Sequence, residues 1–129
     1  MKLEDQVCSL ELARRLKELG VKQESFFLWM TFRNLSSTTP HERLTYLATG
    51  DERYEISGRS FNVEQEHFAA FTVAELGEML PSETYSLKHW DGWRCVYAPS
   101  GPQSEIANTE ADARARMLIH LLENKLVKI

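Results

Sequence analysis

The chain has 129 residues, a length typical of one domain, and 43% of them are hydrophobic and 26% are charged, as in ordinary globular proteins. These values disfavour a disordered or fibrous chain, and they allow a core that folds without a disulfide or a metal. The formal net charge of −4 argues against non-specific nucleic-acid binding, which needs Lys and Arg to displace the counterions of phosphate. We therefore expect a single domain over residues 1–129 whose main partner is neither DNA nor RNA.

Two features of the sequence bear on its compartment. Cys8 and Cys95 lie far apart and outside any CxxC pair, which predicts two reduced and largely buried thiols. Residues 1–13 lack the apolar run of a signal peptide, and no stretch approaches the roughly 18 apolar residues of a membrane span. These observations predict a cytoplasmic protein with no membrane partner.

The N-terminal half is predicted to form one helix and then strands. Ser9 is a good N-cap and Gly20 takes the left-handed conformation at little cost, so we expect a helix between them. The aromatic run Phe26–Phe32 predicts a strand buried on both faces, and the polar run 33–43 predicts a loop. The next segments predict, in chain order, a strand, a turn and a short third strand: Leu44–Thr49, 50–53 and Tyr54–Ile56. Residues 57–67 have no pattern that assigns them.

Two helices are predicted in the C-terminal half. Thr72 and Glu75 have the spacing of a capping box, and Pro81 ends the short helix that follows. Thr109 caps a last helix, whose wide apolar stripe extends to Leu126 and predicts burial against a sheet.

A hairpin is predicted between these two helices. The dipeptide Asp91-Gly92 is typical of a type I′ turn, which would join strands Thr84–Trp90 and Trp93–Ala98 and make Trp90 and Trp93 a facing pair. Residues 99–108 predict a loop. The whole order is α-β-β-(β)-α-β-β-α, which predicts an α+β fold with an antiparallel sheet of about four to five strands packed by two or three helices.

The residue types that carry chemistry do not form a recognised motif. There is no glycine-rich phosphate loop, and no histidine pairs with another histidine or a cysteine at ligand spacing, so neither a metal nor a cofactor is predicted; the histidines are His41, His67, His89 and His120. Arg94 beside Cys95 could lower the thiol pKa, although the alternation W-x-C-x-Y favours a core cysteine. Cys8, just before the first helix, could be activated by the helix dipole or pack against its first turn.

The aromatic residues of the hairpin suggest a binding surface. Trp90, Trp93 and Tyr97 could stack a nucleobase or another planar ligand on an open face, and nearby cations could meet its phosphates: Arg94, Arg53 and Lys88. The alternative is a structural cross-strand cluster with no ligand.

Both ends of the chain resemble a known group of proteins. The segments SLELARRLKELG, TVAELGEMLP and EADARARMLIHLLEN resemble conserved-looking stretches of small, largely uncharacterised proteins of bacteriophages and prophages. The resemblance covers both ends and the second helix but not the middle, 33–67. It implies a phage-type gene and a bacterial host cytoplasm, and it carries no functional residues.

Three functions follow as hypotheses. The first is a non-catalytic phage-type binding protein that counters a host defence by sequestering a small nucleotide-like ligand or a host protein. The second is a small cysteine- or histidine-dependent hydrolase, which requires Cys95, His89 and His67 to meet in one pocket. The third is a structural or adaptor protein with a flat apolar patch and no concave pocket.

We also expect a homodimer, held through the last helix or through an edge strand. Met117 and Leu121 widen the apolar stripe of that helix beyond what one sheet face requires, and burying each is worth roughly 1.5–3 kcal/mol. The competing explanation is that residues 57–67 fold over this surface within one chain.

Overall fold

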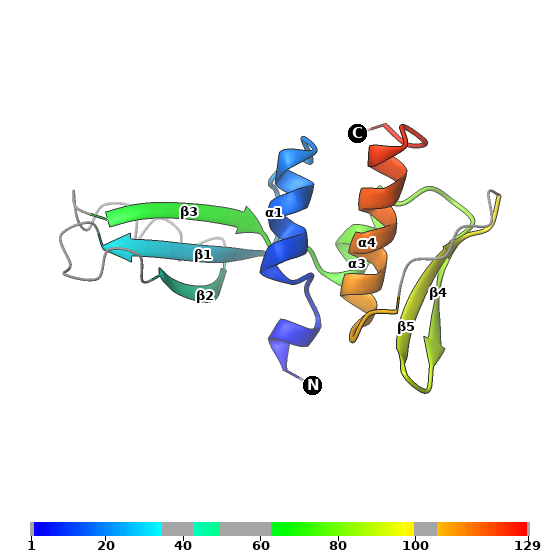
Figure 1. Ribbon diagram of the computed structural model, residues 1–129, viewed down its shortest axis with the longest axis horizontal. Helices are drawn as coiled ribbons and strands as arrows, with labels where there is room; N and C mark the ends of the chain where they lie inside the picture. The colour runs from blue at the N-terminus through cyan, green and yellow to red at the C-terminus, as the bar shows by residue number, and fades with distance from the viewer. Residues whose placement is uncertain (1, 35–42, 50–62, 100–105, 129) are drawn as a thin grey trace.

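The structure is a computed structural model that describes residues 2–34, 43–49, 63–99 and 106–128. It has an α+β fold, as predicted, with antiparallel strands and helices in nearly the predicted order. The strands form two sheets rather than one. Figure 1 shows a three-stranded sheet at one end, α1 and α4 side by side in the middle, and a two-stranded hairpin at the other end. The predicted strand Tyr54–Ile56 and Arg53 lie outside the described residues.

Helix α1 (Leu10–Glu18) ends as predicted at Gly20, which has φ +91°. The Gly20 amide donates to the Lys17 carbonyl (3.0 Å) and the Val21 amide to the Leu16 carbonyl (3.1 Å), the hydrogen-bond pattern of a Schellman motif. Its beginning differs from the prediction. The Ser9 hydroxyl makes no capping bond, and instead the Ser9 amide donates to Asp112 Oδ1 of the last helix at 2.7 Å.

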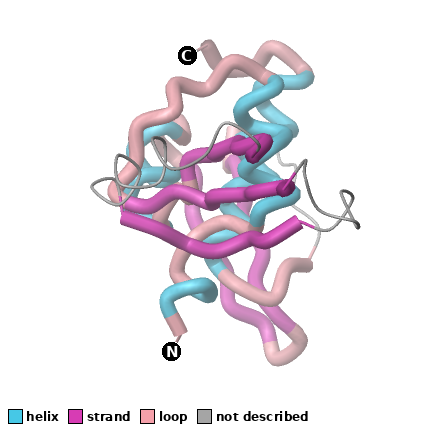
Figure 2. The backbone as a smooth tube through the Cα atoms, turned by 90° about the vertical axis from the view of Figure 1, so that its left-hand side faces the viewer, coloured by secondary structure: helices cyan, strands magenta, loops and turns pink. Residues whose placement is uncertain are grey.

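The larger sheet has the strand order β2-β1-β3, with β1 (Phe27–Asn34) in the middle between β2 (Arg43–Thr49) and β3 (Val63–Ala69). Figure 2 shows these three strands in front of the helices. The strands extend into the predicted loop 33–43 from both ends, because antiparallel pairing satisfies the backbone of polar residues as well as apolar ones. Strand β3 falls partly in the segment that had no assignment.

Central strand β1 is largely buried on both faces, as predicted. Leu28 and Met30 are buried with Ala48 on one face, and Thr31 is buried on the other. Trp29 lies on the same face as Thr31, and its Nε1 donates to the Cys8 carbonyl at 2.8 Å, which ties the sheet to the start of α1. Phe26, expected in this strand, precedes it and is 75% exposed.

Helix α3 (Val73–Met79) begins with the predicted capping box. The Glu75 amide donates to Thr72 Oγ1 at 3.1 Å, and the Thr72 amide donates to Glu75 Oε1 at 2.9 Å. Helix α4 (Glu110–Glu123) begins as predicted at Thr109, whose Oγ1 accepts from the Asp112 amide at 3.1 Å. Both helix starts therefore follow from local side-chain chemistry.

The hairpin consists of β4 (Thr84–His89) and β5 (Gly92–Tyr97), and its turn lies one residue earlier than predicted, which shifts the strand pairing by two residues. His89 pairs with Gly92, so Trp90 and Asp91 form the turn, and Trp93 pairs with Lys88 rather than with Trp90. The type I′ turn is wrong, because neither turn residue has a positive φ. Gly92 instead takes φ +148° in the strand.

Gly92 is required by packing against the segment before α4. A Cβ at this position would lie 2.6 Å from the Ala107 carbonyl oxygen and 2.7 Å from Ile106 Cγ2. Next to it, Trp93 and Ala107 exchange two backbone hydrogen bonds of 2.8 and 2.9 Å. The close approach that fixes the register is thus a contact of Gly92 with a segment that lies outside the hairpin.

The main core surrounds α4, which contacts α1, α3 and both hairpin strands. Met117 and Leu121, the two residues expected to need a partner subunit, are 1% and 0% exposed within the single chain. The prediction of a dimer through these two side chains is therefore wrong, because neighbouring elements of the same chain already bury them. Leu126, the end of the predicted stripe, follows α4 and is 52% exposed. Of residues 57–67, the proposed alternative cover, 57–62 lie outside the described residues and 63–67 belong to β3.

Candidate functional site

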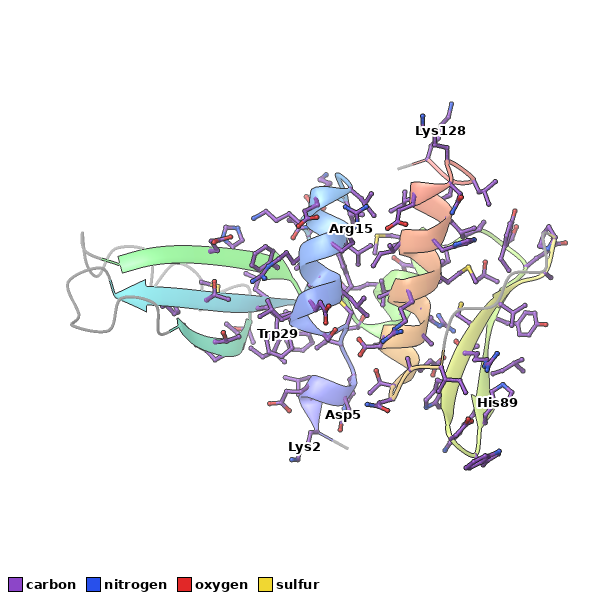
Figure 3. All side chains as sticks on the ribbon, in the orientation of Figure 1. Lys2, Asp5, Arg15, Trp29, His89 and Lys128 are labelled. Carbon is purple, nitrogen blue, oxygen red and sulfur yellow. The ribbon has the colours of Figure 1, made fainter. Side chains whose placement is uncertain are left out.

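A cleft of about 700 Å³ opens where four segments meet. The segments are the short 3-10 helix η1 (Leu3–Asp5), the first residues of α3, the first residues of α4, and the turn end of β5. Figure 3 labels Asp5 of η1 and His89 beside the hairpin turn, which both lie on the lower side of that view. The cleft is lined by Asp5, Gln6, Thr72, Val73, Ala74, Trp93, Asn108, Thr109 and Glu110.

The two capping residues bring two helix starts to this cleft. Thr72 and Thr109 line it, and each accepts from its own helix with the hydroxyl oxygen, which leaves the hydroxyl hydrogen for another acceptor. The amides of the first helical residues after them have no acceptor within the helix. These amides are candidate donors to a ligand in the cleft, which the side-chain amides of Gln6 and Asn108 also line.

The ionised groups of the cleft are acidic. Asp5 and Glu110 line it, and no Lys or Arg is among the described residues that do so. Glu110 Oε2 lies 3.2 Å from Nη2 of Arg114, a half-buried pair, so part of its charge is balanced within α4. Asp5 is exposed. A bound phosphate would therefore meet two carboxylates in the lining itself, and the cation near the cleft wall is Lys88, over the Trp93 ring.

Trp93 forms the aromatic wall of the cleft. Its backbone N–H and C=O are both held by the two hydrogen bonds with Ala107, and its partner in β4 is Lys88. Its ring packs against the main core and stays partly exposed, and the Lys88 ammonium lies 5.7 Å from the ring centroid. The indole is therefore a fixed surface on which a planar group could stack.

The predicted site residues do not gather in one place. Alternation along β5 puts Trp93 and Tyr97 on the face toward α4, where Tyr97 packs against the core about 13 Å along the strand from Trp93. Arg94 lies on the opposite face, and Trp90 lies in the turn with 97% of its surface exposed. Of the predicted set, the structure brings together Trp93 and Lys88 only. Arg53 lies outside the described residues.

The remaining members of the cleft were missed by sequence reasoning. Thr72 and Thr109 were recognised only as helix caps, and Asp5 and Asn108 belong to segments with no pattern of their own. The sequence did indicate that two capped helices begin on either side of the hairpin. It did not indicate that the starts of these helices meet at one cleft, because that depends on tertiary packing.

The cysteines occupy core positions. Both are 0% exposed, and burial raises the pKa of Cys8 to about 12 and that of Cys95 to about 11. The predicted convergence of Cys95 with two histidines is wrong, because His67 belongs to the other sheet and His89 lies on the hairpin face opposite Cys95. Cys8 packs as a core residue, and the dipole does not activate it.

Among the residues that the structure describes, no group of three or more His, Cys, Asp or Glu side chains is placed to hold a metal ion. None of the helices described is long and apolar enough to cross a membrane.

No protein-family model matches the chain, and neither a curated protein nor a solved structure matches it. The function is therefore inferred from the geometry of the site.

Proposed function

We propose that the chain is a non-catalytic binding protein that holds a small planar nitrogen heterocycle, of the nucleobase or nucleoside kind, in the Trp93 cleft. The observation that carries this proposal is a fixed, partly exposed indole in the wall of a cleft of about 700 Å³. Ligand pockets in proteins commonly have volumes of 300–1,000 Å³ and combine an aromatic or apolar wall with a few polar groups.

The polar groups favour a ring with its own donors and acceptors. Asp5 and Glu110 accept hydrogen bonds, while Asn108 both donates and accepts. A nucleobase has N–H donors and carbonyl or ring-nitrogen acceptors at its edge and a flat face for the indole. The acidic lining argues against phosphates, so a nucleoside fits better than the nucleotide expected from the sequence.

Calorimetric titration with nucleobases, nucleosides and the matching monophosphates tests this proposal. Stacking of a base on an aromatic ring is worth about 1–3 kcal/mol, so Trp93→Leu should weaken binding by roughly tenfold or more. Trp90→Ala is the matched control, because Trp90 is fully outside the cleft, and it should bind as the wild type does. Asp5→Asn tests the carboxylate of the lining. Because Asp5 is exposed, a loss of affinity in this variant would not reflect unfolding.

Two results would contradict the proposal. One is tighter binding of the monophosphate than of its nucleoside, which would require cations that the cleft lining lacks. The other is unchanged affinity in a Trp93→Leu variant that still unfolds cooperatively.

The biological setting is proposed from the resemblance to phage proteins. Sequestering a nucleoside-like molecule would counter a host defence that uses such a molecule as a signal, in the cytoplasm of a bacterial cell. Mass spectrometry of small molecules released from protein purified out of infected cells would identify the ligand. The homodimer also remains a proposal, and with α4 removed as its interface the edge strand is the place to look.

A further inference from the structure

The outer edge of β4 is the feature of the hairpin that the ligand cleft does not use. Among the described residues, β4 pairs only with β5, whereas the far edge of β5 is paired at Trp93 with Ala107. Figure 1 shows β4 in the hairpin that forms one end of the molecule. Its side chains away from α4 include Tyr85 and Leu87, which are 46% and 37% exposed.

The hydrogen-bond pattern shows which backbone groups of β4 face this edge. The Ala98 amide donates to the Glu83 carbonyl, so residues at odd numbers along β4 point their backbone groups toward β5. The backbone of Trp93 agrees with this alternation. Its N–H and C=O turn away from its partner Lys88 and toward Ala107, so Lys88 is not in a hydrogen-bonded pair with β5. The residues with outward backbone groups are therefore Thr84, Ser86 and Lys88.

We propose that a second copy of the chain pairs with β4 in antiparallel register, with Ser86 opposite Ser86 of the second copy. This two-fold register also sets Thr84 opposite Lys88 of the second copy, in both directions. All three pairs have their backbone groups facing each other, and each exchanges two hydrogen bonds, about six in total. The two hairpins then form one four-stranded sheet with a self-complementary interface.

The side chains agree with this register. It places Tyr85 beside Leu87 of the second copy as a non-hydrogen-bonded pair, in which the Cα atoms lie about 4.5 Å apart and the side chains are closest. It also places Glu83 opposite His89 of the second copy. A shift by two residues would set Leu87 against itself and Tyr85 against His89, and it would leave only two complete pairs within the strands, Ser86 with Lys88 in each direction.

The usual obstacles to edge pairing are absent from β4 itself. The strand contains no proline, and its one lysine, Lys88, directs its ammonium to the Trp93 ring on the inner face. The pairing also gives a neighbour to Trp90, the most exposed large apolar residue among those described, because it brings the turn beside residues 81–83 of the second copy. The inference does not rest on the proposed ligand, since the cleft lies on the other face of the hairpin.

A charge-swap experiment tests the pairing. Sedimentation equilibrium of the wild type at about 100 µM should give twice the chain mass of 14.9 kDa. Tyr85→Glu with Leu87→Glu puts like charges opposite each other across the two-fold axis and should give a monomer, as should Tyr85→Lys with Leu87→Lys. Mixing the two variants should restore the dimer mass. Phe26→Glu, at an exposed site in the other half of the molecule, is the control and should remain dimeric.

Either of two results overturns the proposal. A wild-type mass of one chain rules out the second copy as occupant. A dimer that survives in both double variants places the interface elsewhere. Circular dichroism of each variant confirms that a monomer is folded, and recovery of the dimer on mixing cannot arise from unfolded chains.

Discussion

The contact between Asp112 and Ser9 joins the starts of two helices, and its removal should have a measurable cost. Asp112 is the third residue of α4, where its amide is capped by Thr109, and its Oδ1 accepts from the Ser9 amide at 2.7 Å. It therefore supplies an acceptor to the amide of Ser9, the residue that precedes α1. Asp112→Ala leaves that amide without an acceptor, whereas Asp112→Asn keeps an oxygen in the same place.

The magnitude follows from the geometry. A hydrogen bond to a charged acceptor contributes about 1.5–3 kcal/mol, and the partly buried position leaves little water to replace it. We expect Asp112→Ala to lower the free energy of unfolding by about 2 kcal/mol. Asp112→Asn loses the charge near two helix starts but avoids burying a carboxylate, so its cost should be no more than about 1 kcal/mol. Urea unfolding followed by circular dichroism measures both values.

The pH dependence gives the same pair of variants a second test. Burial raises the pKa of Asp112, so the folded state binds its proton more tightly than the unfolded state does. Its contribution is fully present below the unfolded pKa, near 4, and is lost as the pH rises through the folded pKa. The wild type should therefore lose stability relative to Asp112→Asn as the pH rises through the unfolded pKa and then through the higher folded pKa. Two results would refute this reasoning. One is an equal loss of unfolding free energy in Asp112→Ala and Asp112→Asn. The other is a wild type whose unfolding free energy rises relative to that of Asp112→Asn as the pH rises.

The other predictions concern two glycines and the two thiols. Gly92→Ala should lower the free energy of unfolding clearly more than Gly20→Ala does, because a Cβ at Gly92 meets a backbone carbonyl at 2.6 Å. Gly20 has open space, and its substitution should cost only about 1 kcal/mol for its φ of +91°. Urea unfolding measures both values, and equal costs would argue against the close approach. Cys8 and Cys95 should not react with a disulfide reagent at pH 8 until the chain unfolds, and rapid reaction of the native protein would contradict their burial. Because folding raises both thiol pKa values, to about 12 and about 11, their contribution to stability is complete below about pH 8.5 and should decline as the pH rises through these values.

Features governed by neighbouring residues were predictable from the sequence. The capping box at Thr72, the cap at Thr109 and the helix end at Gly20 all depend on contacts within about five residues, and all three are confirmed. The fold class followed because strands occur in consecutive runs between helices.

Features governed by distant contacts were not predictable. The hairpin turn lies one residue earlier than predicted because Gly92 meets the Ala107 segment, which no property of the turn dipeptide reveals. Strand β3 was missed because its polar residues pair with β1 through the backbone and not through an apolar pattern. The wide stripe of α4 correctly indicated burial, but a stripe does not specify whether its cover comes from the same chain or from a partner.

The candidate site shows the same division. Trp93 was identified because an aromatic residue beside a turn is visible in the sequence, and Lys88 because it precedes the same turn. Arg94 was predicted to meet the phosphates of a ligand stacked on Trp93, but it lies on the opposite face because it alternates with Trp93 along the strand. Asp5 and Asn108 enter the cleft only through the packing of η1 and α4 against the hairpin, so their role required the structure.

The three tryptophans allow a direct test of the proposed ligand cleft by nuclear magnetic resonance. Each indole N–H gives its own signal: Trp93 in the cleft, Trp29 bonded to the Cys8 carbonyl, and Trp90 exposed in the turn. Titration of ¹⁵N-labelled protein with a nucleoside should move the Trp93 signal in a saturable way and leave the Trp29 signal in place. Saturable binding that shifts the Trp29 or Trp90 indole while the Trp93 signal stays fixed would contradict the assignment of the ligand to this cleft.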